Sequence, residues 1–323
     1  MSANDFQPTA RIDILKRRSV LLANIRNFFH SNDYWEVETP LLSHDTVVDA
    51  HLDPFRVATA DDSPQSVFLQ TSPEFAMKRL IASGADRIYQ ITKSFRRGEL
   101  GKRHNPEFTM AEWYAVGETY HEQMDFVEGL LRSLQDFDDQ PFARVTYADA
   151  FAATFATDVI DMDASQLTTL ANAHQIDIPT GTATDRDALL NVLLAEQVEP
   201  QLGIKTPAFL YDYPASQSAL AQVRNESPPV AERFELYIDG IEFCNGYQEL
   251  TDANELRHRI TRENSIRVRE GFTELPANSR LLNAMDSGLP GCSGVALGID
   301  RLAMWLFDCD SLSDVIAFPF DRA

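Results

Sequence analysis

The sequence predicts an α+β fold, in which helices flank an antiparallel sheet, and three observations predict it. Several segments alternate apolar and polar residues as strands do, among them "RIYQITKSF" and "ERFELYID". Loops with glycine or proline join such strands in pairs, while the helical patterns are grouped apart from them. The sequence has no internal repeat and no parallel βαβ alternation with a GxGxxG turn.

The first part of the chain is predicted to hold two helices and the strands around a basic hairpin. Apolar residues at helical spacing predict a helix over residues 10–30. "YWEVETPLLS" is expected to be extended up to its proline, and residues 43–66 are expected to form a loop with a weak strand. "VFLQT" reads as a strand, and Ser72-Pro73 is predicted to open a helix that ends near Ser83. "RIYQITKSF" and "FTMAEWYAV" are predicted to be the two strands of the hairpin.

The second part is predicted to begin with helices and to return to strands. Residues 120–206 are mostly helical in pattern, with a helix over 187–199, and residues 140–205 are expected to be an insertion within a single domain. "AFLYDYP", "ERFELYID" and "IEFCNGYQEL" are predicted strands. A long charged helix is expected over 252–269, and "SGVALGIDRLAMWLF" predicts a strand, a glycine turn and a helix.

Composition limits the classes of partner. The 323 residues are 44% hydrophobic, which is ample for a buried core, and their formal net charge is −21. Such an excess of acid argues against a large nucleic-acid interface, although a soluble surface explains it equally well. No signal peptide and no apolar run of roughly 18 residues is present, which excludes a membrane span. Three cysteines without a CxxC pair favour a reducing, cytoplasmic setting.

The stretch "FRRGELGKRHNPEFTMAEWY", residues 95–114, concentrates cations in this acidic protein. Its polar part contains glycines and a proline between two predicted strands, so we expect a hairpin loop. Arginine suits phosphate because its planar guanidinium donates two parallel hydrogen bonds, and Arg96 stands where the first strand ends. Phe108 could stack on a flat base. The alternatives are a solvated charged hairpin and a phenylalanine that belongs to the core.

A second candidate anion site lies in "SGVALGIDRL". Gly294 and Gly298 allow another group to approach the backbone closely, and Gly298 leads into a helix. Arg301 falls in the first turn of that helix, where backbone N–H groups and the helix dipole favour an anion. Taken alone, Arg301 could be a surface arginine. Two arginine sites at strand ends, however, predict a clamp on one polyphosphate.

Acidic residues form the third constellation. Glu235, Glu242 and Glu249 are spaced by seven across two predicted strands, so a turn near Asp239-Gly240 is needed to bring the first two together. Carboxylates beside phosphates would hold Mg²⁺, which prefers oxygen ligands.

The strand "CNGYQEL" also places polar residues at period two. Asn245, Tyr247 and Glu249 are expected on one face, which could bind a cationic ligand. An exposed polar edge is the alternative reading of this face.

Together these stretches resemble the three signature motifs of class II aminoacyl-tRNA synthetases. "NDYWEVETPLL" is similar to the first motif, with Pro40 as its proline, "FRRGELGKRHNPEF" to the second and "GVALGIDRL" to the third. "TSPE", "RHNPEFTMAEWY" and "EFCNGYQELTD" resemble the lysyl-tRNA synthetase group. The resemblance covers the chain from about residue 10 to its end, with a weaker middle, and implies an antiparallel sheet flanked by helices.

The resemblance implies ATP and Mg²⁺ as cofactors and assigns roles to individual residues. Arg96 and Arg301 are implied to stabilise the transferring phosphate. The implied ATP contacts are Arg96, Arg97, Gly98, Glu99, His104, Asn105, Phe108, Glu242, Phe243, Gly298 and Arg301. The implied amino-acid pocket comprises Ser72, Pro73, Glu74, Glu112, Tyr114, Asn245, Glu249 and Ala296, and the implied Mg²⁺ ligands are Glu235 and Glu242.

Two positions depart from the pattern of the synthetases. The second motif usually reads F-R-x-E, whereas this chain has Gly98 followed by Glu99, so the acid is displaced by one residue. Lysyl-tRNA synthetases carry glycine where this chain has Ala296. The added methyl would narrow the amino-acid pocket and could favour β-lysine over α-lysine, since one methyl in a tight pocket discriminates by about 1–3 kcal/mol.

The first motif begins within about 35 residues of Met1, so we expect no anticodon-binding domain. This resembles a family of shortened lysyl-tRNA synthetase relatives, the elongation factor P–(R)-β-lysine ligases, which implies elongation factor P as partner and lysine or (R)-β-lysine as substrate. The first motif implies a homodimer. We expect the protein in the cytoplasm. Two alternatives stay open: a tRNA-acylating enzyme without the anticodon domain, and a non-catalytic regulator built on a synthetase core.

Overall fold

A computed structural model describes residues 6–58 and 66–323 of the chain. They form two compact units, each assembled from separate segments. Unit 1 comprises Met1–Glu118, Gly129–Asp136 and Leu250–Ala323, and unit 2 comprises Thr119–Glu128 and Phe137–Glu249. Residues 59–65, which belong to the loop expected over 43–66, lie outside the described residues.

The main sheet of unit 1 carries the basic hairpin. Its strands are β1 (Trp35–Glu36), β5 (Arg87–Phe95), β6 (Glu107–Val116) and β12 (Cys292–Gly298). They neighbour one another in that order; β1 pairs with β5 in parallel, and the other pairs are antiparallel. A smaller antiparallel sheet joins β2 (Leu42–Ser43), β4 (Val67–Leu69) and β3 (Arg56–Val57).

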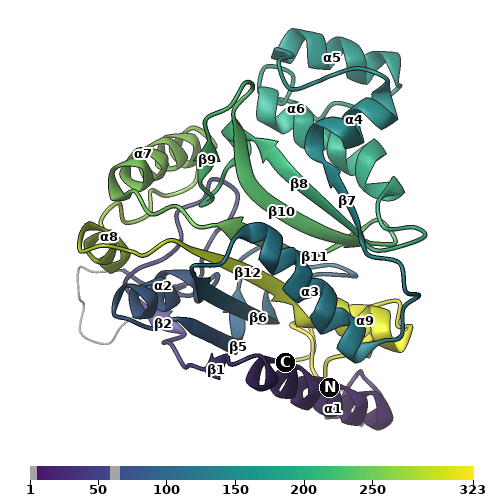
Figure 1. Cartoon of the computed structure of the whole chain (residues 1–323), viewed down its shortest axis with the longest axis vertical. Helices are drawn as coiled ribbons and strands as arrows, with labels where there is room; N and C mark the ends of the chain where they lie inside the picture. The colour runs from purple at the N-terminus through teal and green to yellow at the C-terminus, as the bar shows by residue number, and fades with distance from the viewer. Residues whose placement is uncertain (1–5, 59–65) are drawn as a thin grey trace. The chain divides into compact units, whose positions relative to one another are not determined.

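Helix α1 (Ile12–Ser31) covers one face of this sheet. It places Phe29 against Tyr89 of β5, with ring centroids 4.3 Å apart, and against Trp113 of β6 at 5.2 Å. Alternate residues of β6 therefore face α1, and the residues between them face the opposite side. The remaining helices are α2 (Glu74–Ala82), α7 (Ala253–Arg269), α8 (Arg280–Asp286) and α9 (Ile299–Phe307) (Figure 1).

Unit 2 contains a second group of paired strands. These are β11 (Ile241–Gln248), β10 (Val230–Ile238), β8 (Ala208–Pro214) and β7 (Ala143–Thr146), with β9 (Val223–Arg224) pairing with β10. The pairs β10–β11 and β10–β8 are antiparallel, and β7 runs parallel to β8. A turn at Asp239 and Gly240, with φ of 51° and 70°, joins β10 to β11, as expected from the sequence.

Helices α4 (Tyr147–Phe155), α5 (Ala164–Ala173) and α6 (Arg186–Leu193) lie together in unit 2 (Figure 1). Their buried side chains form one core with residues of β8 and β10, including Leu210 and Tyr237. The helices within residues 140–205 therefore pack on strands of unit 2. Helix α3 (Tyr120–Leu134) has residues in both units.

Most predicted elements are present, and the differences are local. β5 coincides with the predicted strand "RIYQITKSF", and α7 begins after the capping Asp252, whose side chain accepts from two backbone N–H groups. The helix predicted over 187–199 ends at Leu193 and continues as a π-helical turn, Leu194–Val198. β7 and α8 were not predicted.

Among the described residues, no helix is long and apolar enough to cross a membrane.

We expect Leu190→Ala to destabilise unit 2. Leu190 lies in α6, is fully buried, and belongs to the core shared with β8 and β10. The truncation should lower the free energy of unfolding by about 2–5 kcal/mol, because it leaves a cavity. Hydrogen exchange should accelerate in α4 and α6 more than in β5 and β6. Equal acceleration in all four elements would contradict the assignment of these helices to their own core.

Candidate active site

Arg96 stands at the start of the loop between β5 and β6, held by its own backbone and by two neighbours. Its N–H donates to the carbonyl of Pro106 at 2.9 Å, which closes the base of the loop. Its guanidinium lies 5.0 Å above the ring centroid of Phe108 and 3.6 Å from the carboxylate of Glu99. Nε of Arg96 is buried and has no hydrogen-bond partner within the described parts of the chain. A buried N–H without an acceptor can receive an anionic oxygen.

Arg301 reaches the same loop from α9. It lies in the first turn of the helix, after the N-cap Gly298, and donates to Nε2 of His104 at 2.6 Å. Burial lowers the pKa of His104, and the positive charges of Arg301 and Arg96 lower it further. His104 is therefore neutral near pH 7 and can accept this hydrogen bond. Arg301 thus donates a hydrogen bond to His104, and the charges of Arg301 and Arg96 both lower the pKa of His104.

A buried ion pair fixes the beginning of α9. Asp300 accepts from Arg18 of α1 at 2.5 Å and from the backbone N–H of Thr109 in β6 at 2.9 Å. Arg18 also donates to the hydroxyl of Thr109 at 3.0 Å. Asp300 is 3% exposed, so these bonds form in a low-dielectric setting where they are strong. The network connects α1, β6 and α9 immediately beside Arg301.

The predicted amino-acid pocket is centred on Glu112 of β6. Ser72 donates to one oxygen of Glu112 at 2.8 Å and Tyr114 to the other at 2.6 Å. The hydroxyl of Ser72 in turn accepts from the backbone N–H of Glu74, and Pro73 is the N-cap residue of α2. "TSPE" therefore positions the start of α2 next to the Glu112 carboxylate.

A buried lysine completes this cluster. Lys78, one turn after Glu74 in α2, is 2% exposed and donates to the Glu74 carboxylate at 2.5 Å. Its ammonium lies 6.0 Å from the centroid of the Tyr114 ring. The cluster thus contains two carboxylates, Glu74 and Glu112, and one resident ammonium. When both acids are ionised, one negative charge is left without a cation in the cluster.

The pKa of Glu112 is raised in this cluster. Burial raises it from 4.5 to about 7, and the charge of Glu74 raises it as well. Hydrogen bonds from Tyr114 and Ser72, and the charge of Lys78, act in the opposite direction. An ammonium that entered the pocket would stabilise the ionised carboxylate and cause it to release its proton.

β12 supplies the side chain opposite Glu112. Ala296 is the cross-strand partner of Glu112, and Gly294 is the partner of Tyr114. Directly opposed residues of an antiparallel pair share a face, with their Cβ atoms about 4.5–5.5 Å apart. The methyl of Ala296 therefore lies on the same face as Glu112.

In unit 2, β10 and β11 place Glu235 opposite Asn245 and Glu242 opposite Tyr237. One oxygen of Glu235 accepts from Arg233 and from Asn245, the latter at 3.3 Å. The other accepts from Tyr213 and Tyr237, both at 2.6 Å. Burial and the charge of Glu235 raise the pKa of Tyr213, so its hydroxyl stays protonated and donates.

Four donors therefore surround Glu235, which is 6% exposed. They occupy its oxygens, so this environment does not favour the magnesium role that the sequence suggested for it; a structural role fits better. Glu242 is half-buried, and Glu249 and Phe243 are buried. No cluster of three or more His, Cys, Asp or Glu side chains suited to a metal occurs in residues 6–58 and 66–323.

Other predicted ATP residues have protein partners. The amide of Asn105 donates to the carbonyl of Glu107 at 2.6 Å and accepts from the N–H of Phe320 at 2.9 Å, which ties the loop to the C-terminal segment. The guanidinium of Arg97 lies 3.1 Å from the carboxylate of Asp53. Gly98 has φ of +87°, a value that favours glycine.

Lys78, Asp300 and Arg18 were not predicted from the sequence. A signal for Lys78 was present, because Glu74 and Lys78 are four residues apart in a predicted helix. Asp300 directly precedes Arg301, but nothing in the sequence marks it as buried. The pairing of Arg18 with Asp300 joins residues 282 positions apart, which no local pattern reveals.

Comparison with known proteins decides the family. The model of tRNA synthetases class II (D, K and N) matches residues 5–322. The chain belongs to this family. Proteins from Salmonella paratyphi B, Salmonella schwarzengrund and Salmonella paratyphi C, each named elongation factor P–(R)-β-lysine ligase, are 44% identical over 321 residues. The matches cover 98% of this chain and 98% of each relative. The predicted resemblance and the class II fold are confirmed.

We expect Glu112→Gln to change the pH dependence of stability. The folded-state pKa of Glu112 is about 7, above its ordinary 4.5, so its contribution to stability is complete below pH 4.5 and is lost as the pH rises through 7. Glutamine stays neutral. The variant should therefore gain stability relative to wild type from pH 5 to pH 8 in urea unfolding.

Glu107→Gln is the matched control, because Glu107 is an exposed acid on the same strand. It should show no comparable gain between pH 5 and pH 8. A difference between Glu112→Gln and wild type that is constant over this range would contradict the raised pKa.

Proposed function

We propose that this protein activates a lysine-type amino acid with ATP and transfers it to a lysine side chain of elongation factor P. The observation that carries the proposal is the face of β6 that bears both Phe108 and Glu112. Four residues along a strand span about 13 Å, a distance that an extended aminoacyl adenylate can bridge. The arginine beside Phe108 is placed for phosphate, and Glu112 is placed for an amine.

In the first step, Arg96 and Arg301 bind the phosphates. A carboxylate oxygen of the amino acid attacks the α-phosphorus of ATP, the bond to the β-phosphate oxygen breaks, and pyrophosphate leaves with the negative charge. The buried Nε of Arg96 fits such an anion, since it has no acceptor among the described residues. Fixed cations at the reacting phosphate stabilise the transition state without reorganisation.

Glu112 selects for a substrate amine. The pocket already contains one ammonium, that of Lys78, bound to Glu74. A substrate ammonium supplies the charge that ionised Glu112 lacks, whereas a neutral side chain would leave this buried carboxylate without compensation. Lysine-type substrates are favoured for this reason.

We propose the further contacts that the family pattern in "IEFCNGYQEL" implies. Glu242 would give an oxygen to Mg²⁺, which needs only one or two carboxylates when phosphates complete its coordination. The bound ion would neutralise charge on the phosphates. Phe243 is assigned to the nucleotide, and Asn245 and Glu249 to the substrate amines.

In the second step, a lysine of elongation factor P is the acceptor. Its amine attacks the carbonyl carbon of the adenylate, an amide forms, AMP leaves and the amine loses a proton. The relatives named elongation factor P–(R)-β-lysine ligase support this acceptor. The test offers labelled lysine or (R)-β-lysine with ATP, together with elongation factor P or tRNA. We expect label on elongation factor P; label on tRNA alone would favour the acylating alternative.

We expect Arg301→Ala to slow pyrophosphate exchange at least about a hundredfold, the loss typical of removing a preorganised charge at the reacting centre. The exchange should depend on a lysine-type substrate and on Mg²⁺. Arg257→Ala is the control, because Arg257 forms an exposed pair with Asp286. Normal exchange by the Arg301 variant would remove this residue from the mechanism.

We expect Ala296→Gly to shift the preference between lysine isomers towards α-lysine. The methyl on the face of Glu112 disappears, which should change the ratio of adenylation efficiencies by about tenfold or more. ATP affinity should stay the same. Ala111→Gly controls for backbone freedom, since Ala111 lies on the same pair of strands and alternates in face with Glu112. An unchanged isomer ratio would make Ala296 a packing residue only.

We further propose a cytoplasmic homodimer. Ile12 and Val20 of α1, Trp35 and Leu42 are exposed apolar side chains in or near the first motif, which suits an interface. Three free thiols fit a reducing compartment. Sedimentation equilibrium should give twice the mass of the chain; a monomer at micromolar concentration would contradict the dimer.

A further inference from the structure

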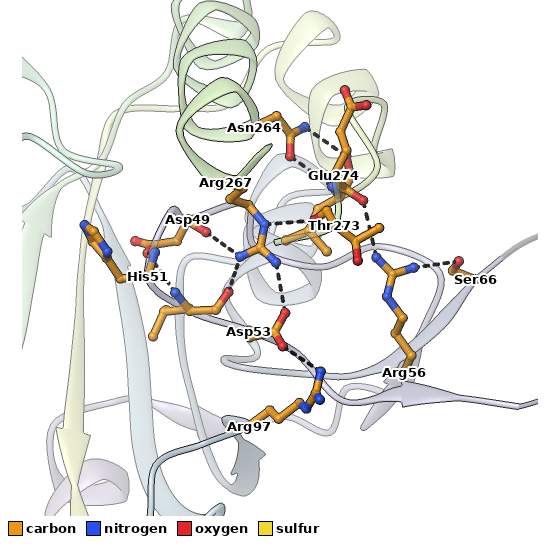
Figure 2. A network of polar contacts seen from close by, with 12 residues as sticks. Asp49, His51, Asp53, Arg56, Ser66, Arg97, Asn264, Arg267, Thr273 and Glu274 are labelled. Atoms are coloured by element: carbon orange, nitrogen blue, oxygen red, sulfur yellow. Dashed lines mark hydrogen bonds and ion pairs between the residues drawn. The ribbon is translucent and has the colours of Figure 1, made fainter. Parts of the chain in front are cut away.

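Arg267 of α7 is a fully buried cation beside the hairpin loop (Figure 2). Nη1 donates to the carbonyls of Asp49 and Leu52, at 2.9 and 2.7 Å, and Nε donates to that of Thr273 at 3.1 Å. Nη2 donates to Oδ1 of Asp53 at 2.9 Å. A buried guanidinium is stable only when its donors are satisfied and its charge is balanced, so Arg267 fixes the position of Asp53.

Asp53 in turn holds the loop between β5 and β6 through two contacts with Arg97. Its Oδ2 lies 3.1 Å from Nη1 of Arg97, and its carbonyl accepts from the N–H of Arg97 at 2.9 Å. One carboxylate thus joins a buried arginine to an exposed one, as Figure 2 shows. Both the backbone and the side chain of Arg97 are restrained.

Arg97 is the immediate neighbour of Arg96. The Arg96 guanidinium lies over Phe108, while that of Arg97 is held by Asp53. Because the two side chains have different partners, the chain at this point cannot rotate without breaking one set of contacts. The direction of Arg96 therefore depends on the Arg97–Asp53 pair.

We propose that Asp53 is a positioning residue for ATP, acting through Arg97 to orient Arg96, with Arg267 as its anchor. This rests on the proposed function of Arg96. It assigns to Arg97 a bond that holds the loop, in place of the ATP contact that the family resemblance implies. Preorganised cations bind and stabilise phosphate better than mobile ones, since their orientation is fixed before ATP arrives.

The test uses Asp53→Asn, which keeps one oxygen for the buried Arg267 and places an amide nitrogen towards Arg97. We expect the dissociation constant for ATP, measured by calorimetry, to rise at least about fivefold. The KM for the amino acid should stay close to wild type, whereas the melting temperature should fall, because buried Arg267 loses the charge that balances it. Trypsin should cleave after Lys102 and Arg103 faster than in wild type, because the loop is released.

Arg97→Ala leaves the Arg267–Asp53 pair intact and guards against a folding defect. It should weaken ATP binding to the same degree, and the double variant should be no weaker than either single one. The control is Asp286→Asn, which breaks an exposed ion pair with Arg257, a residue of α7 like Arg267. This variant should change neither the ATP affinity nor the rate of proteolysis.

Additive effects of Asp53→Asn and Arg97→Ala, or an unchanged ATP affinity in Asp53→Asn, would overturn the inference. The proposed function fails separately, if wild type binds ATP but adenylates no lysine-type substrate. ATP titration and proteolysis need no turnover, so the two failures are distinguishable.

Discussion

The alternation of side chains along β6 is the constraint on which the candidate site depends. Trp113 is fully buried and packs against Phe29 of α1, which fixes the odd-numbered residues of the strand towards the helix. Phe108, Glu112 and Tyr114 are thereby turned to the other face. A slip of one residue would exchange the two faces, so the same packing that stabilises unit 1 sets the register of the site.

The buried carboxylate of Glu112 is the feature of the pocket that bears on the choice of substrate. Glu112 is 2% exposed, and its burial, together with the charge of Glu74, raises its pKa to about 7. The pairing of Glu74 with Lys78 removes one acid from this balance and leaves Glu112 for the ligand. In the proposed function, the cost of burying an uncompensated carboxylate would favour a substrate that carries an amine. Although acidic residues are in large excess over the whole protein, the carboxylate proposed to bind the amine lies on one strand, β6.

Sequence reasoning succeeded where the structure is locally determined. β5 and α7 were predicted almost to the residue, because period-two alternation and the capping Asp252 are local signals. It failed where the partner is distant. Tyr213, which donates to Glu235, lies 22 positions away, although Arg233 and Tyr237 are two residues from Glu235 on the same strand. The short β7 has only four residues of pattern. The Asp53 network joins a loop to α7 over 214 positions, which is beyond any periodicity.

The displaced acid of the second motif follows from backbone geometry. Gly98 occupies a left-handed conformation that side-chain-bearing residues rarely adopt, so glycine rather than glutamate suits this point of the loop. The acid one residue later, Glu99, lies 3.6 Å from Arg96 and raises the pKa of His104 against the effect of Arg301. In the proposed function, an ATP phosphate would take the place of Glu99 beside Arg96. Because this pair is partly exposed, its attraction is weak and a phosphate can displace it, so the loop is ordered before ATP arrives without excluding it.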